Sequence, residues 1–373
     1  MVESSNAEYH FRIMNARTIL MTISLLLSIL IGLAVARQNN ALSNGSGKTD
    51  TAIVIGLSLD TLKEERWQGD RDRFVKRCEE LGVDVLVESA NSNDSTQIQQ
   101  VSALISRNVK VLVIVPHDGA AMASAVDAAN SAGIPVLAYD RMIRNCDLDL
   151  YLSFDNVRVG ELQAQYLVDH LPVKGRGKIV RIYGAPTDNN AKLFKEGQDH
   201  VLKPLIERGD IGVVHEDWAE DWKPENGKKI ANAAITQLNG QFDAVLASND
   251  GTAGGAIQAL TEAGLAGKIL VTGQDAELAA CQRIVAGTQT MTIYKPLKTL
   301  ATGAADIAVQ MAKRKPIVAR QTVANGKKDV PSVLFDIVTV DRGNILDSVI
   351  KDGFQSFDQV YKGVPEDQRP RKP

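Results

Sequence analysis

The side chains best suited to chemistry in this sequence are polar and aromatic residues that follow predicted strands or lie in the loops beside them. Carboxylates accept hydrogen bonds, arginine and lysine donate them, asparagine does both, and an indole ring offers a flat apolar face. Each hydroxyl of a neutral polyol both donates and accepts, so such a set can hold a polyol without reacting with it. The candidates for a binding site are Arg66, Trp67, Asp140, Arg141, Asp188, Asn190, Trp222, Asn249, Asp275 and Lys295.

The sequence contains no arrangement of residues typical of catalysis or metal binding. The G-x-S-x-G and H-E-x-x-H patterns are absent, and the five histidines are scattered along the chain. Residues 43–49 (SNGSGKT) resemble the end of a phosphate-binding loop, but Leu42 stands where that loop requires glycine. We therefore predict no catalytic residue, no metal site and no cofactor.

Two predicted strands indicate why the candidate residues gather. The segment 135–141 (PVLAYDR) ends on Asp140 and Arg141, and the segment 269–276 (ILVTGQDA) ends with Gln274 and Asp275. In open parallel sheets, ligands bind at the carboxyl ends of the strands. Each aspartate could instead cap the helix that follows it, a position that aspartate favours. Because both segments have the same ending, with a polar neighbour beside each aspartate, a binding role is the favoured hypothesis.

These endings belong to a longer alternation of strands and helices. Short runs rich in Val, Ile and Leu, such as 109–116 and 178–184, are separated by amphipathic stretches such as 66–82. The alternation predicts an α/β fold in which parallel sheets carry helices on both faces. The segments 111–140 and 243–275 repeat the same succession of parts, so that Asp140 corresponds to Asp275. We expect two similar doubly wound lobes.

Length and composition narrow the class of protein. A chain of 373 residues is longer than one ordinary hydrophobic core accommodates, so two domains are expected. The net charge is −3, and no concentrated basic face is evident, which argues against a nucleic acid as a partner. The three cysteines, Cys78, Cys146 and Cys281, have spacings that fit neither a disulfide framework nor a zinc site, and we expect them to pack as small apolar residues.

The N-terminus has the features of an export segment. Arg12 and Arg17 precede an apolar run, Ile19–Ala36, whose last three residues have the form of a signal-peptidase site. The run is also long enough to span a bilayer, so residues 1–36 are a signal peptide or an uncleaved membrane anchor. Residues 37–50 are predicted to be a linker. Either alternative exports the rest of the chain.

The sequence resembles the periplasmic sugar-binding proteins of ABC importers from about Ala52 to Gly353. The similar segments include 65–75 (ERWQGDRDRFV), 187–194 (TDNNAKLF), 246–260 (LASNDGTAGGAIQAL) and 290–296 (TMTIYKP). The resemblance implies the type I periplasmic binding protein fold, with two lobes joined by three crossover strands. We place the crossovers near Asn156, near Tyr294 and within 324–334. The expected lobes are residues 51–156 with 295–326, and residues 157–294 with 327–363, followed by a polar tail at 364–373.

The resemblance also implies how the lobes share a site. Arg66, Trp67 and Arg141, with Asp140, would come from the first lobe, and Lys295 would lie at a crossover. The second lobe would supply the remaining five candidates: Asp188, Asn190, Trp222, Asn249 and Asp275.

The function implied is that of a monomeric periplasmic protein that captures a monosaccharide, with D-xylose favoured, and delivers it to a membrane permease. Three alternatives stay open at this stage. A sugar sensor would present the ligand to a chemoreceptor or sensor kinase. A sugar-responsive repressor would need an N-terminal helix-turn-helix, where this chain has an apolar segment instead. An enzyme acting on sugars would need an acid/base pair, which is not evident.

Overall fold

The computed structural model describes residues 53–372, and the predicted export segment and linker lie outside the described residues. The described chain forms two α/β lobes with the alternation that the sequence predicts. Within residues 53–372, no helix combines the length and the apolar character needed to cross a bilayer.

The first lobe is built on a seven-stranded sheet with the strand order β11-β12-β5-β4-β3-β1-β2. Every neighbouring pair is parallel except β11 with β12. Its strands are β1 (Val54–Leu59), β2 (Asp84–Ser89), β3 (Val111–Ile114), β4 (Val136–Tyr139), β5 (Leu150–Phe154), β11 (Gln321–Ala324) and β12 (Asp329–Phe335). Its helices are α2 (Glu65–Glu80), α3 (Asp94–Ser106), α4 (Ala123–Ser131) and α10 (Leu297–Ala312).

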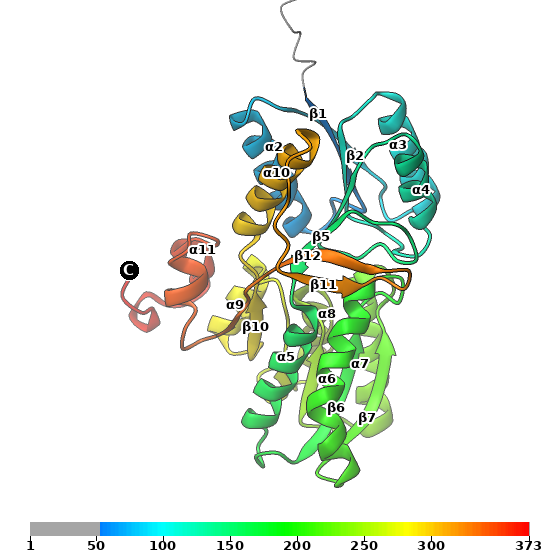
Figure 1. Cartoon of the computed structure of the whole chain (residues 1–373). Coiled ribbons are helices and arrows are strands. Elements are labelled where there is room, and N and C mark those ends of the chain that lie inside the picture. Colours follow the sequence, from blue (N-terminus) through cyan, green and yellow to red (C-terminus); the bar gives the residue numbers. More distant parts are fainter. Residues whose placement is uncertain (1–52, 373) are drawn as a thin grey trace, which may run out of the picture. The chain divides into compact units, whose positions relative to one another are not determined.

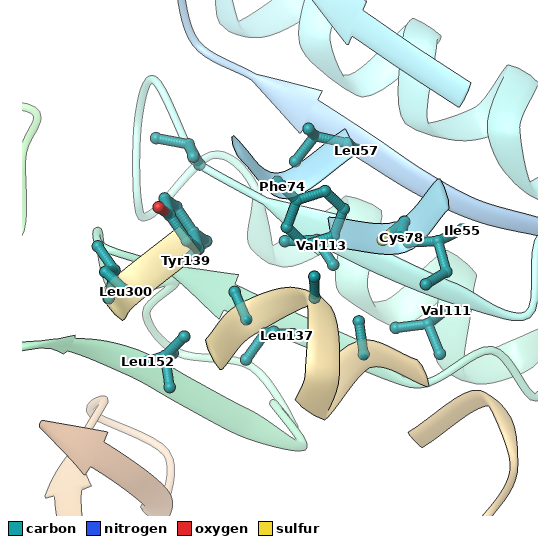
Figure 2. Close-up of a cluster of buried hydrophobic side chains, with 14 of the residues drawn as sticks. Ile55, Leu57, Phe74, Cys78, Val111, Val113, Leu137, Tyr139, Leu152 and Leu300 are labelled. Carbon is teal, nitrogen blue, oxygen red and sulfur yellow. The ribbon is translucent and has the colours of Figure 1, made fainter. Parts of the chain in front are cut away.

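Helices cover both faces of this sheet, and its central strands β3, β4 and β5 are buried on both sides. Figure 2 shows one face, where Phe74 and Cys78 of α2 and Leu300 of α10 pack against side chains of the sheet such as Val113 and Leu137. Figure 1 shows α2 and α10 side by side on that face. The other face packs against α3 and α4. All three cysteines are buried and free, as the sequence predicts for small apolar residues.

The second lobe is built on a four-stranded parallel sheet with the order β7-β6-β8-β9. Its strands are β6 (Gly177–Tyr183), β7 (Ile211–Trp218), β8 (Ala244–Ala247) and β9 (Leu270–Val271), and a separate antiparallel pair joins β10 (Met291–Tyr294) to β13 (Val338–Asp341). Its helices are α5 (Asn156–His170), α6 (Asn189–Glu207), α7 (Pro224–Leu238), α8 (Asp250–Glu262), α9 (Leu278–Ala286) and α11 (Phe357–Val360).

Helices α5 and α6 pack so closely on one face of the second sheet that glycine is required between them. A Cβ atom added at Gly160 would lie 2.0 Å from the carbonyl oxygen of Phe194, and one at Gly197 would lie 1.9 Å from that of Val157. Real Cβ atoms do not approach backbone this closely. The close crossing brings the start of α6, with its polar residues, toward the start of α5.

One expected boundary between the lobes differs from the observed pairing. We expected the second lobe to resume at residue 327, yet Ser332–Phe335 pair in parallel with Tyr151–Phe154 of β5, so β12 belongs to the first sheet. The reason is the hairpin between β11 and β12, which obliges both strands to share one sheet. Its turn contains Asn325 and Gly326, the latter at φ +97°, and Asn-Gly is a strong hairpin signal. The chain therefore passes to the second lobe after Phe335.

Candidate sugar-binding site

The ten candidate residues all line one cavity, which has an empty volume of ≈ 440 Å³. Residues of both lobes form its walls. The structure adds four lining residues that were not among the candidates, namely Glu64, Phe194, Gln274 and Glu277. The cavity thus collects side chains that lie more than 200 positions apart in the sequence.

Asp140 and Asp275 reach the cavity through unusual backbone conformations rather than by capping helices. Asp140 has φ 62° and Asp275 has φ 100°, values that non-glycine residues rarely adopt. The helix caps nearest to them are other residues, Asp155 for α5 and Glu277 for α9. Strained conformations of this kind persist where the surrounding structure enforces them, which is common at ligand sites. The capping alternative is therefore wrong for both aspartates.

The backbone at Asp140 is held by its neighbours on β5. The hydroxyl of Ser153 donates to the carbonyl oxygen of Asp140 at 2.7 Å, and the hydroxyl of Tyr151 donates to the same oxygen at 3.0 Å. From the second lobe, Nδ2 of Asn190 donates to Oδ1 of Asp140 at 3.1 Å. These contacts fix the direction of the carboxylate.

Two other candidates do cap helices while they face the cavity. The side chain of Asp188 accepts from the backbone N–H of Asn190 at the start of α6, and Asn249 accepts from the N–H of Thr252 in the first turn of α8. Capping satisfies backbone donors that the helix leaves free, and it also locks the rotamer of the capping residue. Both side chains are thus positioned at the edge of the second sheet.

Trp222 enters the cavity from a tight turn at Glu220–Trp222, where Asp221 and Trp222 have φ 53° and 58°. Its Nε1 donates to Oδ2 of Asp188 at 3.1 Å, and its ring meets Phe194 edge-on with centroids 6.2 Å apart. Gly184 makes room for the ring, because a Cβ atom there would lie 1.9 Å from Cη2 of Trp222. Trp222 is 8% exposed and lines the cavity.

Trp67, on the opposite wall, is a core residue as well as a lining residue. It is 4% exposed and packs in the core of the first lobe. The guanidinium carbons of Arg66 and Arg141 lie 4.4 Å and 5.2 Å from its ring centroid. The ring therefore supports both guanidinium groups through cation–π contacts.

Ion pairs cross the cavity between the lobes. Arg66 pairs with Asp140 in its own lobe and, through Nη1, with Oδ1 of Asp275 in the other lobe at 3.2 Å. Nζ of Lys295 lies 3.0 Å from the same Asp275 oxygen. Nε of Arg141 lies 2.9 Å from Oδ2 of Asp188. These six side chains are buried, so removing one partner leaves a charge in a poorly solvated place.

The ion pairs oppose the effect of burial on the pKa values of these groups to different degrees. Burial raises the pKa of Asp140, but the neighbouring Arg66 and Lys295 outweigh it and hold that pKa below its usual range. Burial raises the pKa of Asp188, and Arg141 offsets only part of that rise. Burial opposes the charge on Arg66, yet Asp140 and Asp275 raise its pKa. Arg66 and Asp140 thus present a charged donor and a charged acceptor to the cavity, and charged groups form the stronger class of hydrogen bond with hydroxyl groups.

Two of the added lining residues carry buried oxygen atoms with no hydrogen-bond partner among residues 53–372, Oε2 of Glu64 and Oε1 of Gln274. Unpartnered buried acceptors are rare in folded proteins and suit a ligand that donates hydrogen bonds. The sequence held partial signals for them. Gln274 adjoins Asp275, and Phe194 follows Asn190 by one helical turn. Glu64 precedes the helix and carried no such signal.

The residues that the structure describes offer no group of three or more His, Cys, Asp and Glu side chains that could hold a metal ion. His117 does not line the cavity. It lies behind the cavity, where Nδ1 is 2.9 Å from Oδ1 of Asp60.

The fold and the two-lobed cavity define a solute-binding protein, and comparison with known families agrees. Residues 55–316 match the family described as periplasmic binding protein domain, and the chain belongs to that family. It has the type I periplasmic binding protein fold. It is a binding protein and not an enzyme.

Among individual proteins, the chain is 53% identical over 308 residues to the D-xylose-binding periplasmic protein of Escherichia coli, covering 83% of this chain and 92% of that protein. It is 34% identical to the multiple sugar-binding periplasmic receptor ChvE of Rhizobium radiobacter, covering 82% and 92%. A carbohydrate transporter solute-binding protein from Chloroflexus aurantiacus, solved in complex with D-glucose, is similar in structure with a TM-score of 0.76 and 36% identity, covering 83% of this chain and 98% of that one.

Proposed function

We propose that this chain captures a monosaccharide, D-xylose first, in the cavity between its lobes and delivers it to an ABC permease in the inner membrane. The observation that carries the proposal is the cavity itself, which is lined by ion-paired acceptors and donors from both lobes. The E. coli relative at 53% identity, whose name specifies D-xylose, supports the choice of sugar.

The proposed ligand contacts are the ten lining candidates, to which the unpartnered oxygens of Glu64 and Gln274 are added. A sugar that lacks a hydroxyl would leave one of these buried groups unpaired, at a cost of about 1–3 kcal/mol. Selectivity follows from that cost, because a site built to pair with each hydroxyl rejects analogues without it.

Closure of the lobes is the proposed mechanism of capture. The three passages between the lobes are short, and hinges of a few residues absorb the motion of domains around a ligand. A sugar that contacts Asp140 on one side and Asp275 on the other gains all its hydrogen bonds only in the closed form. It therefore shifts the population toward closure, and the permease would recognise that form.

A panel of sugars tests this proposal. The protein is titrated by calorimetry with D-xylose, glucose, galactose, arabinose and ribose. We expect a single site per chain, with D-xylose bound most tightly. Failure of all five sugars to bind would overturn the proposal.

A second function, presentation of the sugar to a chemoreceptor or sensor kinase, is favoured by one observation. The ChvE relative is named a receptor, and it is 34% identical. The two functions use the same closed form and can coexist. We further propose a monomer, exported to the periplasm by residues 1–36. N-terminal sequencing of the exported protein distinguishes a cleaved signal peptide from an anchor at Ile19–Ala36.

A further inference from the structure

Asp60 is a buried carboxylate just outside the cavity, directly after β1. It is 4% exposed, and its two oxygens have different partners. Oδ2 accepts from Nη1 of Arg141 at 2.7 Å, and Oδ1 lies 2.9 Å from Nδ1 of His117. The backbone N–H of His117 donates in turn to Oε1 of Gln97 at 2.8 Å. The Asp60 carboxylate is therefore held in place by His117, which lies on the side of Asp60 away from the cavity.

Arg141 is held by three contacts within the first lobe. Nη1 donates to Asp60 and to the carbonyl oxygen of Pro116, at 2.7 Å and 3.2 Å, and the guanidinium lies over Trp67. Its Nε is directed the other way, to Asp188 of the second lobe at 2.9 Å. The first lobe thus orients the Arg141 guanidinium, and Asp188 of the second lobe contacts it when the lobes close.

This orientation has an energetic consequence for binding. A free arginine side chain has many rotamers, and it loses conformational entropy when it is fixed in one geometry. A group that is already fixed before the ligand arrives avoids most of that cost, so affinity rises without a new contact to the ligand.

We propose that Asp60 is a positioning residue for sugar binding, which holds Arg141 pointed into the cavity and at the second lobe before the lobes close. His117 supports Asp60 from behind. The inference rests on the proposed function, because Arg141 is one of the proposed sugar contacts, whereas Asp60 does not line the cavity.

The test is a thermodynamic cycle with D-xylose as the titrant, using Asp60→Ala, Arg141→Met and the double variant. We expect Asp60→Ala to weaken binding about 10- to 30-fold, the change that corresponds to ~1.4–2 kcal/mol. In the Arg141→Met background the same change should alter affinity less than twofold. Equal losses in both backgrounds would mean a merely structural role and would overturn the inference, as would an unchanged affinity of Asp60→Ala.

A matched control is Asp149→Ala. Asp149 is a first-lobe carboxylate that accepts from the N–H of Val136 at the start of β4, the opposite end of that strand from the cavity. It should bind D-xylose as the unaltered protein does. Asp60→Asn, which keeps an acceptor oxygen, should recover part of the affinity lost in Asp60→Ala.

A crystal structure of Asp60→Ala separates this inference from the proposed function, because it requires no sugar. We expect the Arg141 guanidinium to leave its position over Trp67. An unmoved guanidinium would overturn the inference even if D-xylose binds. A protein that binds none of the five sugars would overturn the proposed function, and the displacement of Arg141 could still be observed in that case.

Discussion

Substitution of Gly184 by alanine tests how the second lobe presents its aromatic wall. The added Cβ would lie 1.9 Å from Cη2 of Trp222, whereas ordinary contacts begin at 3.4 Å, so the ring must withdraw by roughly 1.5 Å. The hydrogen bond from Nε1 of Trp222 to Asp188 is 3.1 Å long and would not survive that displacement.

The expected loss follows from these contacts. A buried carboxylate deprived of one donor costs about 1–3 kcal/mol. Taking ~2 kcal/mol, we expect D-xylose to bind about 30-fold more weakly to Gly184→Ala. Overpacking should also lower the melting temperature, by an amount that corresponds to about 1–3 kcal/mol of unfolding free energy.

Calorimetric titration with D-xylose, well below the melting temperature, is the assay. The control is Gly212→Ala on the adjacent strand β7, where the new Cβ would meet only Cγ1 of Val214, at an ordinary 3.8 Å. Trp222→Phe, which keeps a ring but removes the donor, should show part of the loss. If Gly184→Ala binds within twofold of the unaltered protein, the proposed role of the Trp222 wall is refuted.

Three further predictions concern other parts of the molecule. Arg66→Met leaves Asp140 and Asp275 short of a buried cation, so titration should show D-xylose affinity reduced by more than about 100-fold, and a change below threefold would contradict the proposed contact. Burial, then Asp250 and Asp275, raises the pKa of Glu277 to about 8, above its ordinary 4.5, so the folded state binds the proton more tightly and stability falls as pH rises from about 4.5 to 8. Melting curves at pH 5 and pH 8 should show a smaller decline for Glu277→Gln, and an equal decline would count against this origin. Gly197→Ala should lower the melting temperature because its Cβ meets the Val157 carbonyl oxygen, whereas Gly254→Ala, near only the flexible end of Arg283, should not.

The sequence predicted the two-lobed α/β fold and ten of the fourteen residues that line the cavity because both depend on local patterns. Continuous apolar strands such as β4 indicate a parallel sheet, and polar residues at their carboxyl ends indicate the edge of the sheet where ligands bind. The internal repeat, in which Asp140 corresponds to Asp275, predicted a ligand-binding edge of the sheet in each lobe. Their roles in binding stay predictions until a sugar is measured.

The remaining features depend on tertiary placement, which local patterns do not carry. The ion pair between Arg66 and Asp275 joins residues 209 positions apart, so the local sequence around either residue does not predict the pair. The positive φ of Asp140 is enforced by hydroxyls of β5, and the room for Trp222 is made by Gly184, directly after β6. The assignment of β12 to the first lobe was within reach, because the Asn325-Gly326 turn predicts a hairpin.

A crystal structure of the protein grown with D-xylose tests the central claim most directly. We expect one sugar in the cavity, with hydrogen bonds to Asp140 or Arg141 of the first lobe and to Asn249 or Asp275 of the second. A sugar bound elsewhere, or in contact with a single lobe, would contradict the account.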